Sequence, residues 1–170
     1  MAKIRSFVCY RNKKRPYTRF SKYKSKSFVR SRPHNRISRY TGGEHAEYDH
    51  KVHLVSKEGL QIRDHALESA RQTIVRNIEK HLGKAGFFYQ MRIYPHHVLR
   101  ENPLASGAGA DRLSTGMAHS FGKPIGRAAQ INKGQELFTV HTNKDKISII
   151  KTALQKASHK LPCKTKIAIE

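Results

Sequence analysis

The clearest pattern along the chain is a stripe of apolar residues at steps of three and four between Asp64 and Leu82. This spacing places apolar side chains on one face of an α-helix, and Gly83 is a suitable residue to end it. The opposite face carries both charge signs, which is typical of a solvated surface. We therefore predict a structural helix with one buried face. Its apolar stripe consists of Leu67, Ala70, Ile74, Ile78 and Leu82.

A second helix is predicted after Asn143, because asparagine is favoured as an N-terminal cap. Apolar residues again recur at helical spacing, while several lysines occupy the other positions. The pattern predicts a helix that buries one face. Its apolar stripe consists of Ile147, Ile150, Leu154 and Ala157.

Other segments alternate between apolar and polar residues or form short extended runs, which is typical of strands. Asn132, Lys133 and Gly134 predict a turn between two of them. The order of elements predicts a single α+β domain over residues 44–170, with two helices packed on a mixed, largely antiparallel sheet. The predicted strands are residues 48–55, 87–93, 97–100, 127–131, 136–142 and 165–169.

Charge adds a second feature to this frame. The chain has 34 Lys and Arg against 12 Asp and Glu, a net charge of +22. Such an excess favours a polyanionic partner, because like charges repel across a compact surface. No apolar run of about 20 residues is present, and the N-terminus lacks the apolar stretch of a signal peptide. We therefore expect a cytoplasmic protein that binds nucleic acid rather than a membrane.

The charge is concentrated at the N-terminus. Residues 1–40 contain 14 Lys and Arg and no acidic residue. Aromatic residues are interleaved with these bases, as suits an arm that follows phosphates and stacks rings on bases. We interpret residues 1–43 as an RNA-binding arm in preference to a disordered basic tail, since such tails are poor in aromatics. The aromatic residues are Phe7, Tyr10, Tyr17, Phe20, Tyr23, Phe28 and Tyr40.

A long glycine-rich stretch, residues 102–126, separates two predicted strands. Loops longer than about 15 residues in a compact domain are usually functional or disordered. The stretch contains no complete phosphate-binding motif, and Pro124 stands after Lys123 where a magnesium-binding hydroxyl would be required. Ser114 lacks the motif of a hydrolase nucleophile. We therefore expect neither a nucleotide site nor an enzyme.

A metal site is also not expected, although the chain has eleven histidines. His96 and His97 are adjacent, so on a strand they point to opposite faces. The cluster around His45, His50 and His53 has no cysteine and no defined geometry. Two cysteines lie near opposite ends of the sequence. No cofactor or metal is predicted.

Several sequence runs carry a resemblance to a known family. GADRLSTGM (109–117), FGKPIG (121–126) and MRIYPHHVLRENP (91–103) are the most specific, and CYRNKKRPYTR (9–19) and ALESAR (66–71) extend it over almost the whole chain. The chain resembles the large-subunit ribosomal protein sixteen family, in its archaeal and eukaryotic branch, also called ten-e. Residues 21–29 are longer and more basic than this resemblance leads us to expect.

The resemblance implies a hammerhead-like α+β sandwich that binds large-subunit ribosomal RNA near the transfer-RNA sites and the peptidyl transferase centre. It also implies contact with transfer RNA and with neighbouring large-subunit proteins. The glycine-rich loop, residues 102–116, would extend toward the transfer-RNA sites, and in eukaryotic members it is linked to the last steps of subunit maturation. The alternative from another class is a free-standing RNA-binding or ribosome-assembly factor.

The residues and the resemblance together give candidate RNA contacts in three groups. The arm contributes Arg5, Arg11, Lys13, Lys14, Arg15 and Arg19. The domain contributes Arg92, Arg100, Lys123 and Arg127. The transfer-RNA-proximal loop contributes Ser106, Gly107, Gly109, Asp111 and Arg112. Within the loop we expect Arg112 to contact phosphate, because a guanidinium forms bidentate hydrogen bonds to it, with Asp111 either orienting Arg112 or forming an ordinary solvated pair with it.

Overall fold

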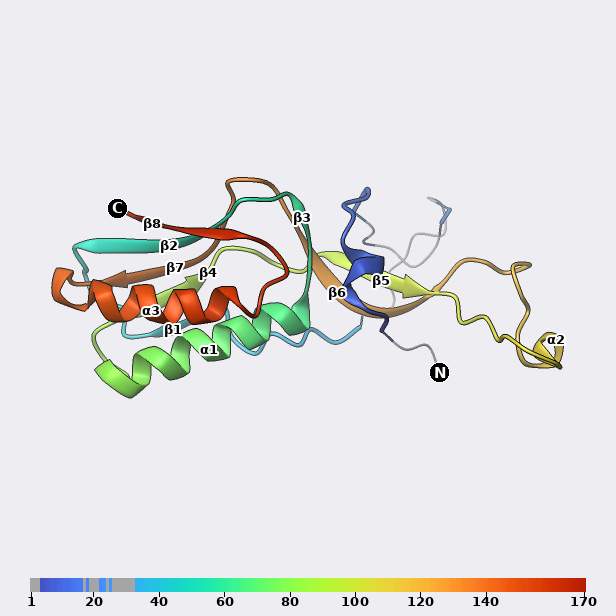
Figure 1. The fold of residues 1–170 in the computed structure, drawn as a ribbon, viewed down its shortest axis with the longest axis horizontal. Coiled ribbons are helices and arrows are strands. Elements are labelled where there is room, and N and C mark those ends of the chain that lie inside the picture. The colour runs from blue at the N-terminus through green and yellow to red at the C-terminus, as the bar shows by residue number, and fades with distance from the viewer. Residues whose placement is uncertain (1–3, 17, 19–21, 24, 26–32) are drawn as a thin grey trace.

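The computed structural model describes the whole chain except residues 1–3, 17, 19–21, 24 and 26–32. The described part is elongated (Figure 1). Two long helices and a five-stranded sheet form one end, a three-stranded sheet lies in the middle, and a loop with a short helix forms the other end. The predicted single sheet is therefore wrong, because the strands divide between two sheets.

The larger sheet has the strand order β1-β4-β7-β2-β8. Every strand pair in the described chain is antiparallel, so the predicted α+β class with largely antiparallel strands is confirmed, and no described pair is parallel as a mixed sheet would require. The chain after β7 crosses over the sheet to β8, which does not lie next to β7. Strand β2 lies between them and pairs antiparallel with both, so β7 and β8 form no parallel pair. The strands are β1 (Thr41–Gly43), β2 (His50–Ser56), β4 (Phe88–Met91), β7 (Glu136–Thr142) and β8 (Thr165–Ile169).

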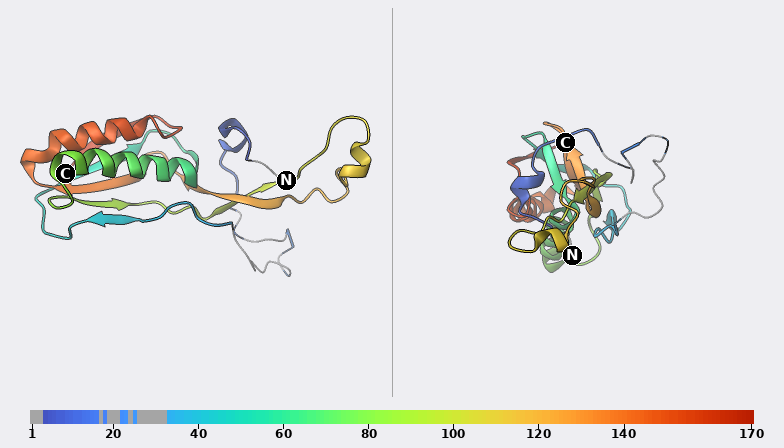
Figure 2. Two further views of the ribbon diagram at one scale, coloured as in Figure 1. Left: turned by 90° about the horizontal axis from the view of Figure 1, so that it is seen from below. Right: turned by 90° about the vertical axis from the view of Figure 1, so that its right-hand side faces the viewer.

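Two helices, α1 (Asp64–Leu82) and α3 (Ile147–Ser158), cover one face of this sheet (Figure 2). The predicted bounds of α1 are confirmed, and Gly83 ends it with a φ of 73° and an N–H donated to the Glu79 carbonyl. The predicted cap of the second helix is wrong. Asn143 precedes the 3-10 turn η3 (Lys144–Lys146), and within this described segment its side chain makes no capping hydrogen bond.

The smaller sheet has the order β3-β6-β5 and consists of β3 (Leu60–Arg63), β5 (His97–Glu101) and β6 (Lys123–Ile131). Strand β6 begins four residues earlier than predicted. Gly122 precedes it at a close approach of two chain segments, where an added Cβ would lie 2.8 Å from the carbonyl carbon of Glu101. This contact brings the end of the glycine-rich loop against β5, so pairing begins at Lys123.

The end of the predicted arm joins the main core. Ile37 is buried there, and β1 pairs with β4. At the centre of this core, the apolar side chains of α1 and α3 pack on the inner face of the larger sheet. Its fully buried residues include Leu67, Ile74, Ile78, Phe138, Ile150 and Leu154.

Replacing Ile74 by alanine should lower the free energy of unfolding by about 2 to 4 kcal/mol, because it removes buried methyl groups and leaves a cavity. Ile74 is 1% exposed on the face of α1 that packs in the core. Urea denaturation measures the effect, and Arg76→Ala on the exposed face of the same helix is the control. Equal unfolding midpoints for Ile74→Ala and the unmodified chain would place Ile74 outside the core.

Glu68 on α1 forms a partly buried ion pair with Arg71 and also accepts hydrogen bonds from Ser38, which attach residues 33–40 to the helix. Glu68 accepts hydrogen bonds from Nε and Nη2 of Arg71 at 2.8 and 2.6 Å, and from Oγ of Ser38 at 3.1 Å. Burial raises the pKa of Glu68, but hydrogen bonds from Arg71 and Gln72 and the Arg71 charge lower it more strongly, to about 2. The ionised carboxylate therefore stabilises the fold.

We expect the pair to weaken in acid. Because the folded-state pKa is depressed, its stabilisation is present above the ordinary value of 4.5 and is lost as the pH falls toward about 2. Glu68→Gln should lower the free energy of unfolding at pH 7 by up to about 3 kcal/mol and flatten the pH dependence below pH 5. Denaturation at several pH values measures this, with the exposed Glu79→Gln as control. Superimposable curves for Glu68→Gln and the unmodified chain would contradict it.

Candidate nucleic-acid interface

The N-terminal segment, residues 4–16, lies against the smaller sheet. The backbone N–H of Gln61 donates to the Arg11 carbonyl at 3.3 Å, and its side chain donates to the Tyr10 carbonyl at 3.1 Å. Arg63 donates to the Arg5 carbonyl at 2.9 Å. These contacts attach the first part of the basic arm to β3, so its cations occupy defined places on the folded surface.

Tyr10 shows that not every aromatic ring of the arm is available to RNA. It ends the 3-10 helix η1 (Phe7–Tyr10), is 8% exposed, and packs with Leu99 and Ala128. Its hydroxyl accepts a hydrogen bond from the Arg5 N–H at 3.0 Å. The interpretation of the arm aromatics as stacking rings is therefore wrong for Tyr10, because the second sheet offers it an apolar surface within the protein.

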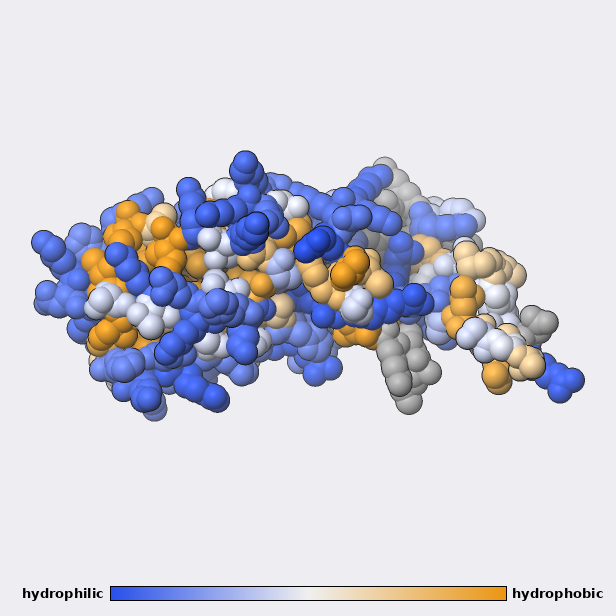
Figure 3. All heavy atoms as spheres, in the orientation of Figure 1, coloured by the Kyte–Doolittle hydropathy of each residue, from blue (hydrophilic) through white to orange (hydrophobic). Residues whose placement is uncertain are grey.

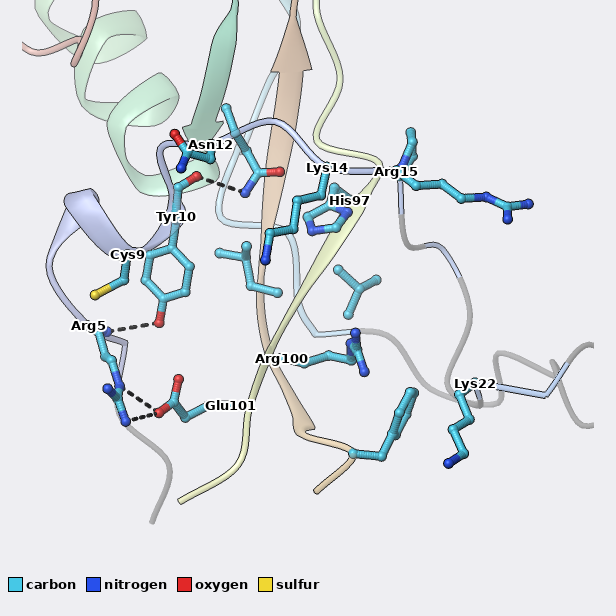
Figure 4. Close-up of a pocket in the computed structure, with 15 residues that line it drawn as sticks. Arg5, Cys9, Tyr10, Asn12, Lys14, Arg15, Lys22, His97, Arg100 and Glu101 are labelled. Atoms are coloured by element: carbon cyan, nitrogen blue, oxygen red, sulfur yellow. Dashed lines mark hydrogen bonds and ion pairs between the residues drawn. The ribbon is translucent and has the colours of Figure 1, made fainter. Parts of the chain in front are cut away.

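A cleft of about 640 Å³ opens between the N-terminal segment and β5 (Figure 4). We call it the N-terminal cleft. Of the described residues that line it, five are cations and one, Glu101, is a carboxylate. Glu101 pairs with Arg5 at 2.6 Å, and this ion pair neutralises the carboxylate. Glu101 therefore does not neutralise the other cations of the cleft. The remaining lining cations are Lys14, Arg15, Lys22 and Arg100.

The planar side chains in the cleft favour a ligand that carries phosphate and a planar base. The Arg100 guanidinium lies over the Phe121 ring, 4.2 Å from its centroid. A guanidinium can donate hydrogen bonds to phosphate, and planar bases stack on guanidinium and aromatic faces. Burial and, to a lesser degree, the Arg100 charge lower the pKa of His97, so this imidazole is neutral at pH 7. The cleft can therefore bind phosphate and contact a base.

A second hollow, of about 470 Å³, lies beside the first and contains two predicted residues, Arg112 and Lys123. Phe121 lines both hollows, so they form one continuous surface from the N-terminal segment to the loop. Lys22 and Phe121 line the candidate interface, and the sequence prediction did not include them. Lys22 lies in the basic arm and Phe121 in the run FGKPIG, and those signals could have indicated them.

Four other predicted contacts, all among the described residues, do not line these hollows. Arg11 is exposed over the Phe7 ring at 5.6 Å, and Lys13 donates to Asn132. Arg127 is half-buried and donates to the Tyr94 hydroxyl at 3.2 Å. Arg92 is exposed beside the larger sheet, with Glu136 at 3.4 Å. Arg19 lies outside the described residues.

The glycine-rich loop extends beyond the smaller sheet and carries the short helix α2 (Ala110–Leu113) at its end (Figure 1). Gly107 and Gly109 have φ values of 109° and 81°, and no described atom lies within 4 Å of a Cβ built at either position. Arg112 and Ser106 are exposed. Apolar surface is also uncovered at this end of the molecule (Figure 3). The Asp111 side chain is not among those described. Its predicted pairing with Arg112 stays a prediction.

The exposed large apolar residues of the loop are Leu104, Leu113 and Met117, whose exposed fractions are 51, 81 and 67%.

Over the described residues, no group of three or more His, Cys, Asp or Glu side chains could hold a metal ion. In the same part of the chain, no helix has the length and apolarity needed to cross a membrane.

Comparison with known proteins shows the family of this chain. The family model described as ribosomal protein L16p/L10e matches residues 12–168. The chain is 42% identical over 168 residues to the large ribosomal subunit protein uL16 of Methanococcus aeolicus, covering 98% of this chain and 94% of that protein. It is 38% identical over 162 residues to the protein of the same name from Archaeoglobus fulgidus, with 95 and 90% covered. The chain therefore belongs to the ribosomal protein L16p/L10e family, a non-enzymatic family of the large ribosomal subunit.

Proposed function

We propose that this chain, a structural protein of the large ribosomal subunit that works in translation, binds large-subunit ribosomal RNA through the N-terminal cleft. The carrying observation is the gathering of Lys14, Arg15, Lys22 and Arg100 around a cleft whose lining carboxylate is already paired. Cations placed in this way neutralise phosphates and release their counterions. Phe121 and the Arg100 guanidinium provide surfaces on which an unpaired base can stack.

The glycine-rich loop acts as the transfer-RNA-proximal element of the same surface. Its backbone is extended away from the two sheets, and Arg112 is exposed at its end. Glycines at the tip let the backbone approach a polyanion closely, and the guanidinium can bind a phosphate with two hydrogen bonds. Within the cytoplasmic ribosome, the protein thus contacts ribosomal RNA, neighbouring large-subunit proteins and transfer RNA.

Sedimentation of the full chain with ribosomes tests this function. We expect it to remain with large subunits, in one copy per subunit, after a wash at high salt. A free-standing assembly factor would instead be present at much less than one copy, or would be removed by the wash. The second result would overturn the proposal of a resident structural protein.

A further inference from the structure

A second cationic surface lies on the helical layer, in the groove between α1 and α3. Two hollows of about 280 and 310 Å³ follow this groove and share Asn77. Asn77 accepts a hydrogen bond from Lys156 Nζ at 2.9 Å, which ties the two helices together across the groove. We call this surface the interhelical groove.

The described lining of the groove includes cationic side chains but no carboxylates. In the described chain, no carboxylate lines either hollow, although α1 carries both charge signs along its length. Cations stand on both sides, with Arg76 on α1, Lys156 on α3, and Lys160 in the turn that follows α3. The acidic Glu79 lines the neighbouring hollow on α1, which shares Arg76 with the groove, and Glu68 is held by Arg71. A polyanion laid along the groove therefore meets cations from both helices.

Hydroxyl groups between the cations add a second property. Thr73 and Thr152 each donate their hydroxyl hydrogen to a backbone carbonyl one turn earlier, at 2.8 and 3.1 Å. Each hydroxyl oxygen keeps lone pairs with which it can accept a hydrogen bond. A 2′-hydroxyl is a donor that such oxygens can accept from, and it is present in RNA but not in DNA. The combination of cations and hydroxyl acceptors matches the phosphates and riboses along one side of an A-form duplex.

We propose that the interhelical groove binds the sugar-phosphate backbone of a second, double-stranded segment of ribosomal RNA. This inference rests on the proposed function and extends it, because the chain then joins two RNA segments, one at the N-terminal cleft and one at the helical layer. Hydrophilic side chains border the helices over this face, with some apolar surface between them (Figure 3). An acidic protein segment is the competing occupant, and it would not use the hydroxyl acceptors.

The first test uses the purified full chain and a 20-base-pair RNA duplex of mixed sequence as the probe. Replacing Arg76, Lys156 and Lys160 together by glutamine should reduce the slope of log affinity against log salt by about 2 to 3. A matched control replaces three exposed lysines of the larger sheet and its neighbouring turn, Lys51, Lys164 and Lys166. The control slope should change by less than one unit. Equal changes in both variants, with unchanged melting temperatures, would overturn the inference.

The second test places a photo-crosslinking benzophenone amino acid at the exposed Thr152 position or at Lys14, in chains assembled into large subunits. We expect both positions to crosslink to ribosomal RNA, at different nucleotides. If position 14 reaches RNA while position 152 reaches protein or nothing, the groove does not bind RNA and the function proposed for the cleft stands. If neither position reaches RNA, both proposals fail.

Discussion

Neutralising the N-terminal cleft should weaken binding to large-subunit ribosomal RNA by about a hundredfold to a thousandfold near 0.15 M salt. The variant replaces Lys14, Arg15, Lys22 and Arg100 by glutamine, four cations that line the cleft. Each lost phosphate contact removes about 0.7 to 0.9 from the slope of log affinity against log salt, so four contacts remove about 3. Filter binding at a series of salt concentrations measures both the affinity and the slope.

The control separates a specific surface from the effect of net charge. It replaces four exposed lysines outside the cleft, Lys51, Lys144, Lys164 and Lys166. Both variants lower the net charge of +22 by the same amount. If binding depends only on total charge, the two will lose affinity equally, and the assignment of the cleft is wrong. A tenfold or larger difference between them supports the cleft.

Deleting residues 105–110 should impair binding of transfer RNA to large subunits while leaving the fold almost unchanged. Most of these residues are exposed, and Cβ atoms at Gly107 and Gly109 would meet no described atom within 4 Å. The deleted residues therefore contribute little packing, and we expect the free energy of unfolding to change by less than about 1 kcal/mol. Incorporation into large subunits should also be nearly normal.

Two measurements check this prediction. Thermal unfolding of the isolated protein reports on the fold, and filter binding of transfer RNA to subunits carrying the shortened chain reports on function. Arg112→Gln, which keeps the loop length, should reproduce part of the loss if the guanidinium contacts phosphate. Normal transfer-RNA binding would show that the loop is only a connector, and collapse of the isolated domain would show that it is a core element.

The parts of the fold that local patterns specify were predictable. Helix α1 has its apolar stripe and Gly83 within one continuous segment, and β7 and β8 are continuous runs rich in β-branched residues, so their bounds match the predictions. Strand β3 was missed because it is short and runs directly into α1 without a turn residue between them. The division into two sheets follows from which strands pair, and pairing depends on contacts that a single segment does not encode.

The same limit applies to the site. The sequence indicated a basic arm and named Arg100, yet the cleft exists only because residues 4–16 return to β3 and β5. The contacts that bring them there, Gln61 with Tyr10 and Arg5 with Glu101, join residues 51 and 96 positions apart. Composition alone could not predict that Arg5 would neutralise Glu101 within the cleft. It also could not predict that the residues of α1 lining the groove beside α3 would include no carboxylate.

A density map of the large ribosomal subunit containing this chain would show directly whether ribosomal RNA occupies the N-terminal cleft. We expect RNA phosphates within about 4 Å of the side-chain nitrogens of Lys14, Arg15 and Arg100, the usual limit of an ion pair. We also expect RNA, rather than protein, in the cleft beside Phe121. A map in which the cleft faces solvent or another protein, while ribosomal RNA contacts the chain elsewhere, would contradict this expectation.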